Sequence, residues 1–168
     1  MASKIPSHQA DSEERSIMII SVKPHWADAI ARGQKTVELR RRKPHIIAGQ
    51  PFIVYSTLPE GRLVALGRIT QVVEGTPDEL WHATHESTMI GRDDFDAYFG
   101  GASTAYGLCL DSSSRLVEQP TLQELRDRSG FIAPQSWQFA TPAQCLSMFS
   151  TSWGREQISQ SLSMSVHR

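Results

Sequence analysis

Short runs of apolar and β-branched residues that end at turn signals constrain the fold of this 168-residue chain most. The first run, SIMIISV, is typical of a buried strand and ends at Lys23-Pro24. The runs PFIVYST and RLVALGRITQVV flank Pro59-Glu60-Gly61, as the two strands of an antiparallel hairpin do. We therefore expect strands, in chain order, at residues 16–22, 35–41, 51–57, 62–73 and 104–111.

Helical patterns lie between these strands. Thr76 followed by Pro77 is a strong helix start, because Thr caps a helix and Pro fits its first turn. We expect helices at residues 25–33, 77–87, 91–101 and 121–130. Since the strands and helices form no repeated strand–helix–strand unit, the pattern predicts an α+β fold: a small mixed β-barrel with short helices inserted between the strands.

The length suits one domain, which we expect over residues 16–153. Residues 1–15 are polar and without periodicity, and are predicted to be a disordered lead. Residues 154–168 are rich in Ser and Gln, and are expected to be a polar tail or a frayed helix.

The formal net charge of −1 argues against a protein that coats nucleic acid or an anionic membrane by bulk charge, so any contact with a polyanion must be local. The chain contains neither a membrane-length apolar run nor the apolar core of a secretory signal. We expect a cytoplasmic protein without a membrane partner. The sequence also indicates no metal site and no cofactor, and it predicts no oligomeric state.

The strand at residues 35–41 concentrates the charge of the chain. Side chains of a strand alternate between its faces, so Thr36, Glu38 and Arg40 share one face. Glu38 and Arg40 can hold a planar polar ligand together, while Lys35 and Arg41 add positive potential at either end of the strand. The alternative is a solvated strand face that carries a surface ion pair.

The same segment resembles a known family. Gly33, Lys35, Glu38 and Arg40 fill the G-x-K-x-x-E-x-R string of the ASCH-domain family, which is related to the PUA-like RNA-binding barrels. Downstream segments such as VYST and APQSWQF are also similar to a branch of that family, so the resemblance covers about residues 16–139. It implies a PUA-like β-barrel with a central cleft that contains the charged residues of the string.

The resemblance also implies a role and a set of site residues. It places three further groups near the cleft: Tyr55 and Ser56, then Tyr106, then Gln135, Ser136 and Trp137. We expect RNA or a modified nucleotide or nucleoside to bind there, together with Lys35, Thr36, Glu38, Arg40 and Arg41.

Hydrolysis is an alternative to binding, either as a ribonuclease or as an amidohydrolase of acylated cytidine, with Lys35 and Glu38 as the catalytic residues. The amidohydrolase branch carries a threonine where this chain has Glu38, so Thr36 or Ser56 would have to supply the hydroxyl. A third alternative is a protein-interaction module in transcription or translation. The sequence leaves open whether the protein is an enzyme.

Overall fold

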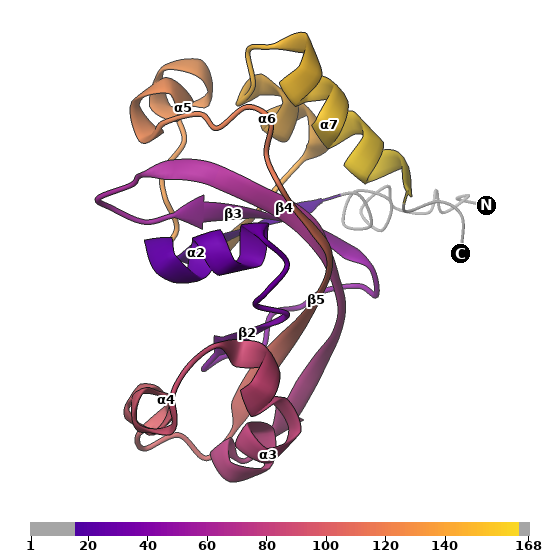
Figure 1. Cartoon of the computed structure of the whole chain (residues 1–168). Helices are drawn as coiled ribbons and strands as arrows, with labels where there is room; N and C mark the ends of the chain where they lie inside the picture. Colours follow the sequence, from indigo (N-terminus) through magenta and orange to yellow (C-terminus); the bar gives the residue numbers. More distant parts are fainter. Residues whose placement is uncertain (1–15, 165–168) are drawn as a thin grey trace, which may run out of the picture.

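The computed structural model describes residues 16–164. Six strands form one sheet in the order β2-β5-β4-β3-β1-β6, and six helices join or cover them in the described part of the chain (Figure 1). The strands are β1 (Ile17–Val22), β2 (Val37–Arg40), β3 (Gln50–Ser56), β4 (Arg62–Gly75), β5 (Ala105–Arg115) and β6 (Trp137–Ala140). The helices are α2 (Pro24–Ala31), α3 (Pro77–Thr88), α4 (Arg92–Phe99), α5 (Leu122–Ser129), α6 (Pro142–Ser147) and α7 (Ser152–Ser163).

The sheet is curled into a half-barrel whose end strands are β2 and β6. β1 pairs in parallel with β3, and the other neighbouring strands are antiparallel. The long strand β4 shifts its register against β5 between Leu66 and Arg68 and again between Ile69 and Gln71. Such bulges bend a strand and increase its twist, which helps the sheet to curl. The predicted α+β fold with a small β-barrel and short helices is confirmed.

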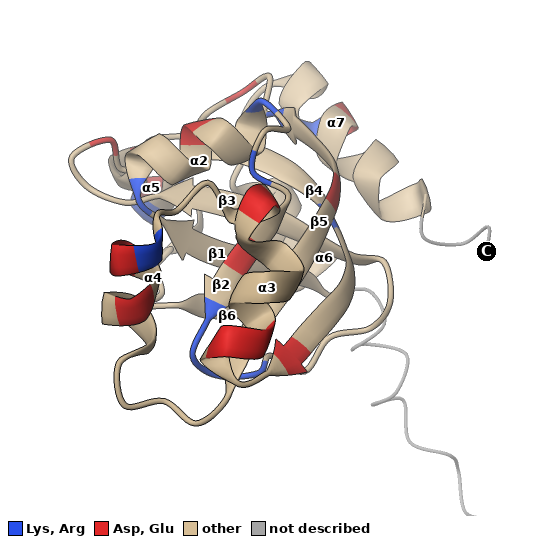
Figure 2. Ribbon diagram, turned by 60° about the horizontal axis from the view of Figure 1, so that its bottom comes forward, with Lys and Arg blue, Asp and Glu red and all other residues tan. Residues whose placement is uncertain are grey.

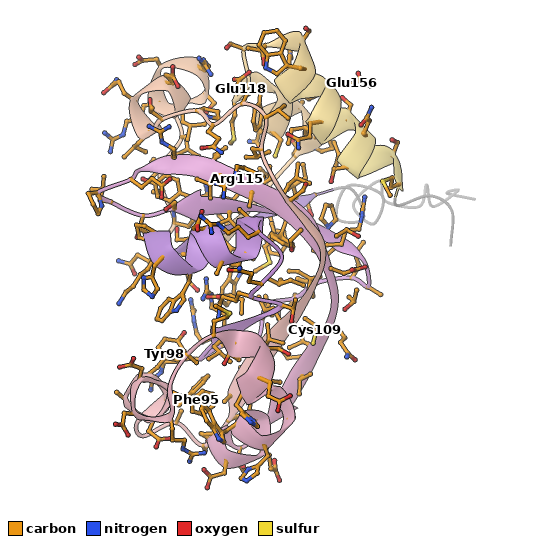
Figure 3. All side chains as sticks on the ribbon, viewed as in Figure 1. Phe95, Tyr98, Cys109, Arg115, Glu118 and Glu156 are labelled. Carbon is orange, nitrogen blue, oxygen red and sulfur yellow. The ribbon has the colours of Figure 1, made fainter. Side chains whose placement is uncertain are left out.

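Apolar side chains of the sheet pack into three clusters. On one face Ile17 and Ile19 pack with residues of α5, α6 and α7. On the other face Met18 and Ile20 pack with α2, because adjacent residues of β1 point to opposite faces. At the far end of β4 and β5, α3 and α4 pack on β2 around Phe95 in a separate α3–α4 cluster. Figure 3 shows Phe95 in this lower part of the molecule, well away from α7.

Charge is unevenly distributed over these parts. Acidic side chains lie on α3 and α4, and a run of cations, Arg41 to Lys43, follows β2 (Figure 2). The described residues include no helix long and apolar enough to cross a membrane.

The segment after residue 153, expected to be a polar tail or a frayed helix, is helical as far as Ser163. Helix α7 continues to Ser163, and its Ile158 is buried in the cluster of α5, α6 and α7. Ile158 and Leu162 are four residues apart, so both face the same side of the helix and pack there. Helix α6 was not expected from the sequence. The segment 1–15 lies outside the described residues.

Candidate functional site

The charged string, Gly33 to Arg40, begins in a tight turn that follows α2. Gly33 has a φ of +73°, a conformation that favours glycine, and the amides of Gln34 and Lys35 bond back to the carbonyl of Ala29. The chain then runs into β2, whose Glu38 and Arg40 point to the same face. The turn therefore places Lys35 beside the first residues of that strand.

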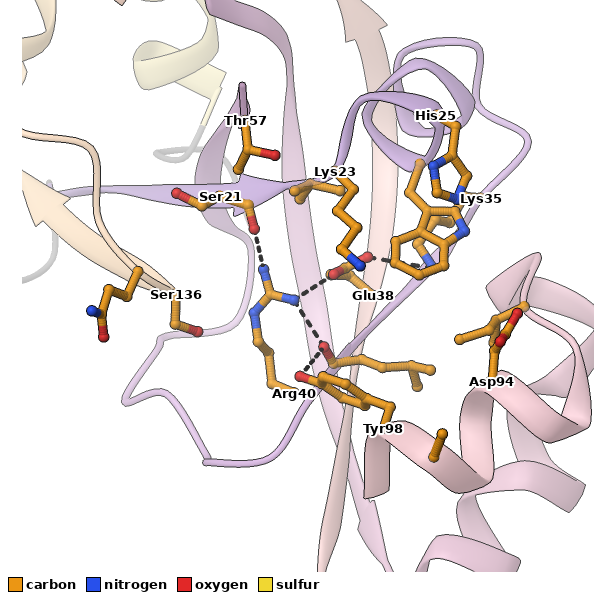
Figure 4. A pocket seen from close by; sticks show the side chains of 16 residues that line it. Ser21, Lys23, His25, Lys35, Glu38, Arg40, Thr57, Asp94, Tyr98 and Ser136 are labelled. Carbon is orange, nitrogen blue, oxygen red and sulfur yellow. Dashed lines mark hydrogen bonds and ion pairs between the residues drawn. The ribbon is translucent and has the colours of Figure 1, made fainter. Parts of the chain in front are cut away.

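Lys35, Glu38 and Arg40 form a buried charged cluster, with 2%, 5% and 7% of their surfaces exposed. An ion pair joins Arg40 to Glu38, and Arg40 also donates to the carbonyls of Leu39 at 2.9 Å and Ser21 at 2.8 Å (Figure 4). The Nζ of Lys35 donates to the carbonyl of Thr88 at 2.5 Å and lies 3.4 Å from Oε2 of Glu38. The cluster carries two cations and one carboxylate, so its formal charge is +1.

Two atoms of this cluster keep hydrogen-bonding capacity. Oε2 of Glu38 and Nε of Arg40 are buried and make no hydrogen bond within the described residues, although Oε2 is ion-paired with Lys35. An unmade hydrogen bond of a buried polar group costs about 1–3 kcal/mol, and more for a charged one. The cluster is thus suited to a ligand that supplies the missing partners.

The cluster forms one wall of a pocket of about 770 Å³, a volume within the range of small-molecule sites. One side of the pocket comes from the end of β1 and from α2, and the opposite side from α4 (Figure 4). The polar lining residues are Ser21, Lys23, His25, Lys35, Glu38, Arg40, Thr57, Asp94, Tyr98, Gln135 and Ser136, and the others are Val22, Trp26, Leu39, Ile90 and Ala97.

Burial shifts two pKa values in this pocket. Desolvation lowers the pKa of Lys35, and the nearby carboxylate of Glu38 opposes part of that shift. Desolvation also raises the pKa of Tyr98, whose hydroxyl donates to the carbonyl of Leu39 at 3.3 Å. Lys35 is therefore a better proton donor than an exposed lysine, whereas Tyr98 keeps its proton at neutral pH.

Five of the site residues named from the sequence line the pocket: Lys35, Glu38, Arg40, Gln135 and Ser136. The other six do not. Thr36 and Arg41 are exposed outside the pocket, and Arg41 donates to the carbonyls of Tyr98 and Gly100. Tyr55 is buried against Phe131, and Ser56 donates to Glu60.

Tyr106 and Trp137 also lie outside the pocket lining. Tyr106 pairs with Arg40 across β2 and β5, on a strand that contributes no lining residue. Trp137 directly follows Ser136, and Arg42 lies over its ring. Of the eleven residues that the sequence suggested, five therefore line the pocket and six lie outside its lining.

Sequence reasoning missed the wall formed by α4. Ile90, Asp94, Ala97 and Tyr98 reach the pocket because α4 packs on β2 through Phe95. No local pattern identifies this contact, since α4 and β2 are more than fifty residues apart. Trp26 has the helical spacing of a core residue, and it does pack against the cluster of α2, yet part of it lines the pocket as well.

The fold, the buried string and the pocket together define a class of protein. Comparisons with known families and chains identify that class. The ASCH domain model matches residues 20–128, so this chain belongs to the ASCH domain family. A relative from Zymomonas mobilis, named as an ASCH domain-containing ribonuclease, is 30% identical over 128 residues. That match covers 75% of this chain and 85% of the relative.

Solved structures of the ASCH protein from Zymomonas mobilis have the same fold. One crystal structure superposes with a TM-score of 0.75 and 25% identity, and covers 80% of this chain and 94% of its own. A single-substitution variant of that protein superposes with a TM-score of 0.73 and 21% identity, and covers 88% of this chain and 97% of its own.

Proposed function

We propose that this protein binds RNA and that one nucleotide of the RNA occupies the pocket. The family relative named as a ribonuclease supports RNA as the ligand class. The formal net charge of −1 is consistent with local recognition rather than a basic coat. A pocket recognises one unit of a chain through its shape and its few polar groups.

The observation that carries this proposal is the unused hydrogen-bonding capacity of Glu38 and Arg40 in the pocket wall. Glu38 accepts hydrogen bonds and Arg40 donates them, so the complementary ligand presents donors and acceptors together. The edge of a nucleobase does this, and unpaired bases are read in RNA by such contacts. Lys23 and His25 at the pocket add donors for phosphate oxygens.

A matched pair of variants tests binding. Glu38→Gln keeps the size of the side chain and removes its charge, and we expect the dissociation constant for a mixed-sequence 12-nucleotide RNA to rise about 10- to 100-fold, because hydrogen bonds to charged groups contribute about 1.5–3 kcal/mol. Glu86→Gln, at an exposed glutamate of α3, should bind as the wild type does. Fluorescence anisotropy measures both, and circular dichroism checks the fold. Equal binding by Glu38→Gln and wild type would refute the role of Glu38.

Hydrolysis of the bound RNA is the second candidate, favoured by the buried lysine with its lowered pKa. The 2′-oxygen would attack phosphorus and pass its proton to Glu38, the bond from phosphorus to the 5′-oxygen would break, and Lys35 and Arg40 would stabilise the charge that develops on the phosphoryl oxygens. Attacking and leaving oxygens lie roughly in line. Since Lys35 and Glu38 are only 3.4 Å apart, they serve the same side of the phosphate. The proton for the 5′-oxygen would then come from the α4 side, where Tyr98 lies.

Lys35→Met tests hydrolysis separately from binding. The substitution keeps an unbranched side chain that is one atom shorter, and removes the charge and the donors of the lysine. We expect kcat for 2′,3′-cyclic phosphate release to fall at least about 100-fold with KM changed only a few-fold, as for a group that acts mainly in the transition state. Cleavage by Lys35→Met at the wild-type rate would contradict this role.

The remaining alternatives predict other results. Thr36 and Ser56, the hydroxyls offered for an amidohydrolase, lie outside the pocket lining, so deacylation of an acylated cytidine would need another lining hydroxyl such as Ser136. A wild-type protein that neither binds nor cleaves RNA would favour the protein-interaction module.

A further inference from the structure

Arg42 lies over the ring of Trp137, just outside the pocket. The centre of the Arg42 guanidinium lies 5.3 Å from the centroid of the Trp137 ring, the distance of a cation–π contact. Trp137 is partly buried against the cluster of α2, while Arg42 is exposed. The indole is therefore in contact with the guanidinium of a residue that is open to solvent.

Arg42 differs from its two neighbours in its hydrogen bonding to the part of the chain that the structure describes. Arg41 donates to the carbonyls of Tyr98 and Gly100, and Lys43 is paired with Glu74 at 3.0 Å. Arg42 makes neither a hydrogen bond nor an ion pair with any residue from 16 to 164. Its charge and its N–H groups are thus available to a ligand.

The pair adjoins the pocket on both of its segments. Arg42 follows the lining residue Arg40 by two residues, in the bend that comes directly after β2. Trp137 directly follows the lining residues Gln135 and Ser136, and pairing of β6 with β1 opposite Ile20 fixes its position. The basic loop that contains Arg42 follows β2, and it reaches the first residue of β6 through the contact of Arg42 with Trp137. Arg42 and Trp137 therefore both lie next in sequence to residues of the pocket lining.

We propose that Arg42, supported by Trp137, is a second nucleotide subsite, where the base next to the one in the pocket stacks on the guanidinium and the phosphate between them accepts its N–H groups. This inference rests on the proposed RNA binding. Guanidinium planes are surfaces on which unpaired bases of RNA stack, and their edges donate to phosphate. A ligand must contain at least two nucleotides to occupy both the pocket and the subsite.

Two probes separate this subsite from the pocket. The four ribonucleosides carry no phosphate and reach the pocket alone, whereas a 12-nucleotide single-stranded RNA reaches both sites. We expect Arg42→Ala to weaken binding of the 12-nucleotide RNA about tenfold and to leave binding of the nucleosides within about twofold of wild type. Arg42→Lys should remain several-fold weaker than wild type for the 12-nucleotide RNA, because an ammonium group cannot stack and fork at once.

Arg155→Ala removes the same charge from α7, on the other side of the sheet, and should leave both affinities unchanged. Wild-type affinity of Arg42→Ala for the 12-nucleotide RNA would overturn the subsite while the pocket proposal stands. Wild-type affinity of Arg42→Lys would reduce the site to a phosphate contact without stacking, and would overturn the proposal as stated. Failure of the wild type to bind either probe would overturn the proposed function and the subsite together.

Discussion

The pKa of Lys35 should respond to the charge of Glu38. Burial lowers this pKa below 10.5 and the carboxylate of Glu38 opposes the shift, so we expect Glu38→Gln to lower it further. Titration of the Lys35 Cε resonance by NMR measures both values. A pKa that rises or stays constant in Glu38→Gln would contradict the coupling that the 3.4 Å ion pair implies.

The same shift gives a pH dependence with a definite sign. Between the folded pKa of Lys35 and 10.5, the unfolded chain binds more protons than the folded one. The contribution of Lys35 to the free energy of unfolding therefore increases as the pH rises through that interval. Urea denaturation of wild type and Lys35→Met at several pH values tests it, since the variant lacks this contribution. A wild-type contribution that falls with pH in this interval would contradict the depressed pKa.

Single residues of the string could be predicted because their geometry is local. The alternation of a strand fixes that Glu38 and Arg40 share a face, whichever fold surrounds them. Their burial could not be predicted in this way, since the same pattern suits a solvated strand face. The burial of Glu38 and Arg40 depends on Ser21 and α4. The carbonyl of Ser21 accepts a hydrogen bond from Arg40, and α4 forms the opposite side of the pocket.

At the scale of the elements, helix caps were the reliable signals. Thr76 and Thr121 each form a capping box with a glutamate three residues later, and both helices were expected. Thr141 forms the same box with Gln144 at the start of α6, which was not expected. The signal Thr-Pro-Ala-Gln is present in the sequence, so α6 could have been found from it. Helix α7 carries only two apolar residues on its packed side, and its burial depends on tertiary contacts.

Glu118 connects the C-terminal helices and should matter for stability. It is labelled in Figure 3, between β5 and α5, and its carboxylate accepts from the amides of Ser150 and Thr151 and is paired with Arg128 at 3.3 Å. We expect Glu118→Gln to lower the free energy of unfolding by about 2 kcal/mol at pH 7, because hydrogen bonds to a charged acceptor are lost. Glu156→Gln, at an exposed position of α7, should cost far less in the same urea denaturation.

The loss in Glu118→Gln should also depend on pH. Burial raises the pKa of Glu118, but the hydroxyl of Thr151, the amides of Ser150 and Thr151 and the charge of Arg128 outweigh it, so the folded pKa lies below 4.5. The contribution of Glu118 is complete above 4.5 and is lost as the pH falls through the folded pKa. The difference between wild type and Glu118→Gln should therefore shrink in acid, and a difference that grows would contradict the hydrogen-bonding pattern.

At the scale of the whole molecule, the pocket lies where two packing units meet. Its α2 side belongs to the cluster around Met18 and Ile20, and its α4 side to the α3–α4 cluster around Phe95. Lys35 ties these units together through its bond to the carbonyl of Thr88, at the end of α3. The sequence predicted α2, α3 and α4 but not this junction, because the packing of α4 against β2 is a long-range contact.

Ligand binding at this junction should stabilise α3 and α4 more than the C-terminal helices. A ligand that contacts both sides of the pocket suppresses openings that separate them, so amide hydrogen exchange in α4 should slow when RNA binds. Exchange in α7, which packs on the opposite face of the sheet, is the internal control and should change little. Mass spectrometry of peptides from both regions, with and without the 12-nucleotide RNA, measures the contrast. Equal protection of α4 and α7 would show that RNA acts through overall stability, and unchanged exchange in α4 would place the RNA elsewhere than between α2 and α4.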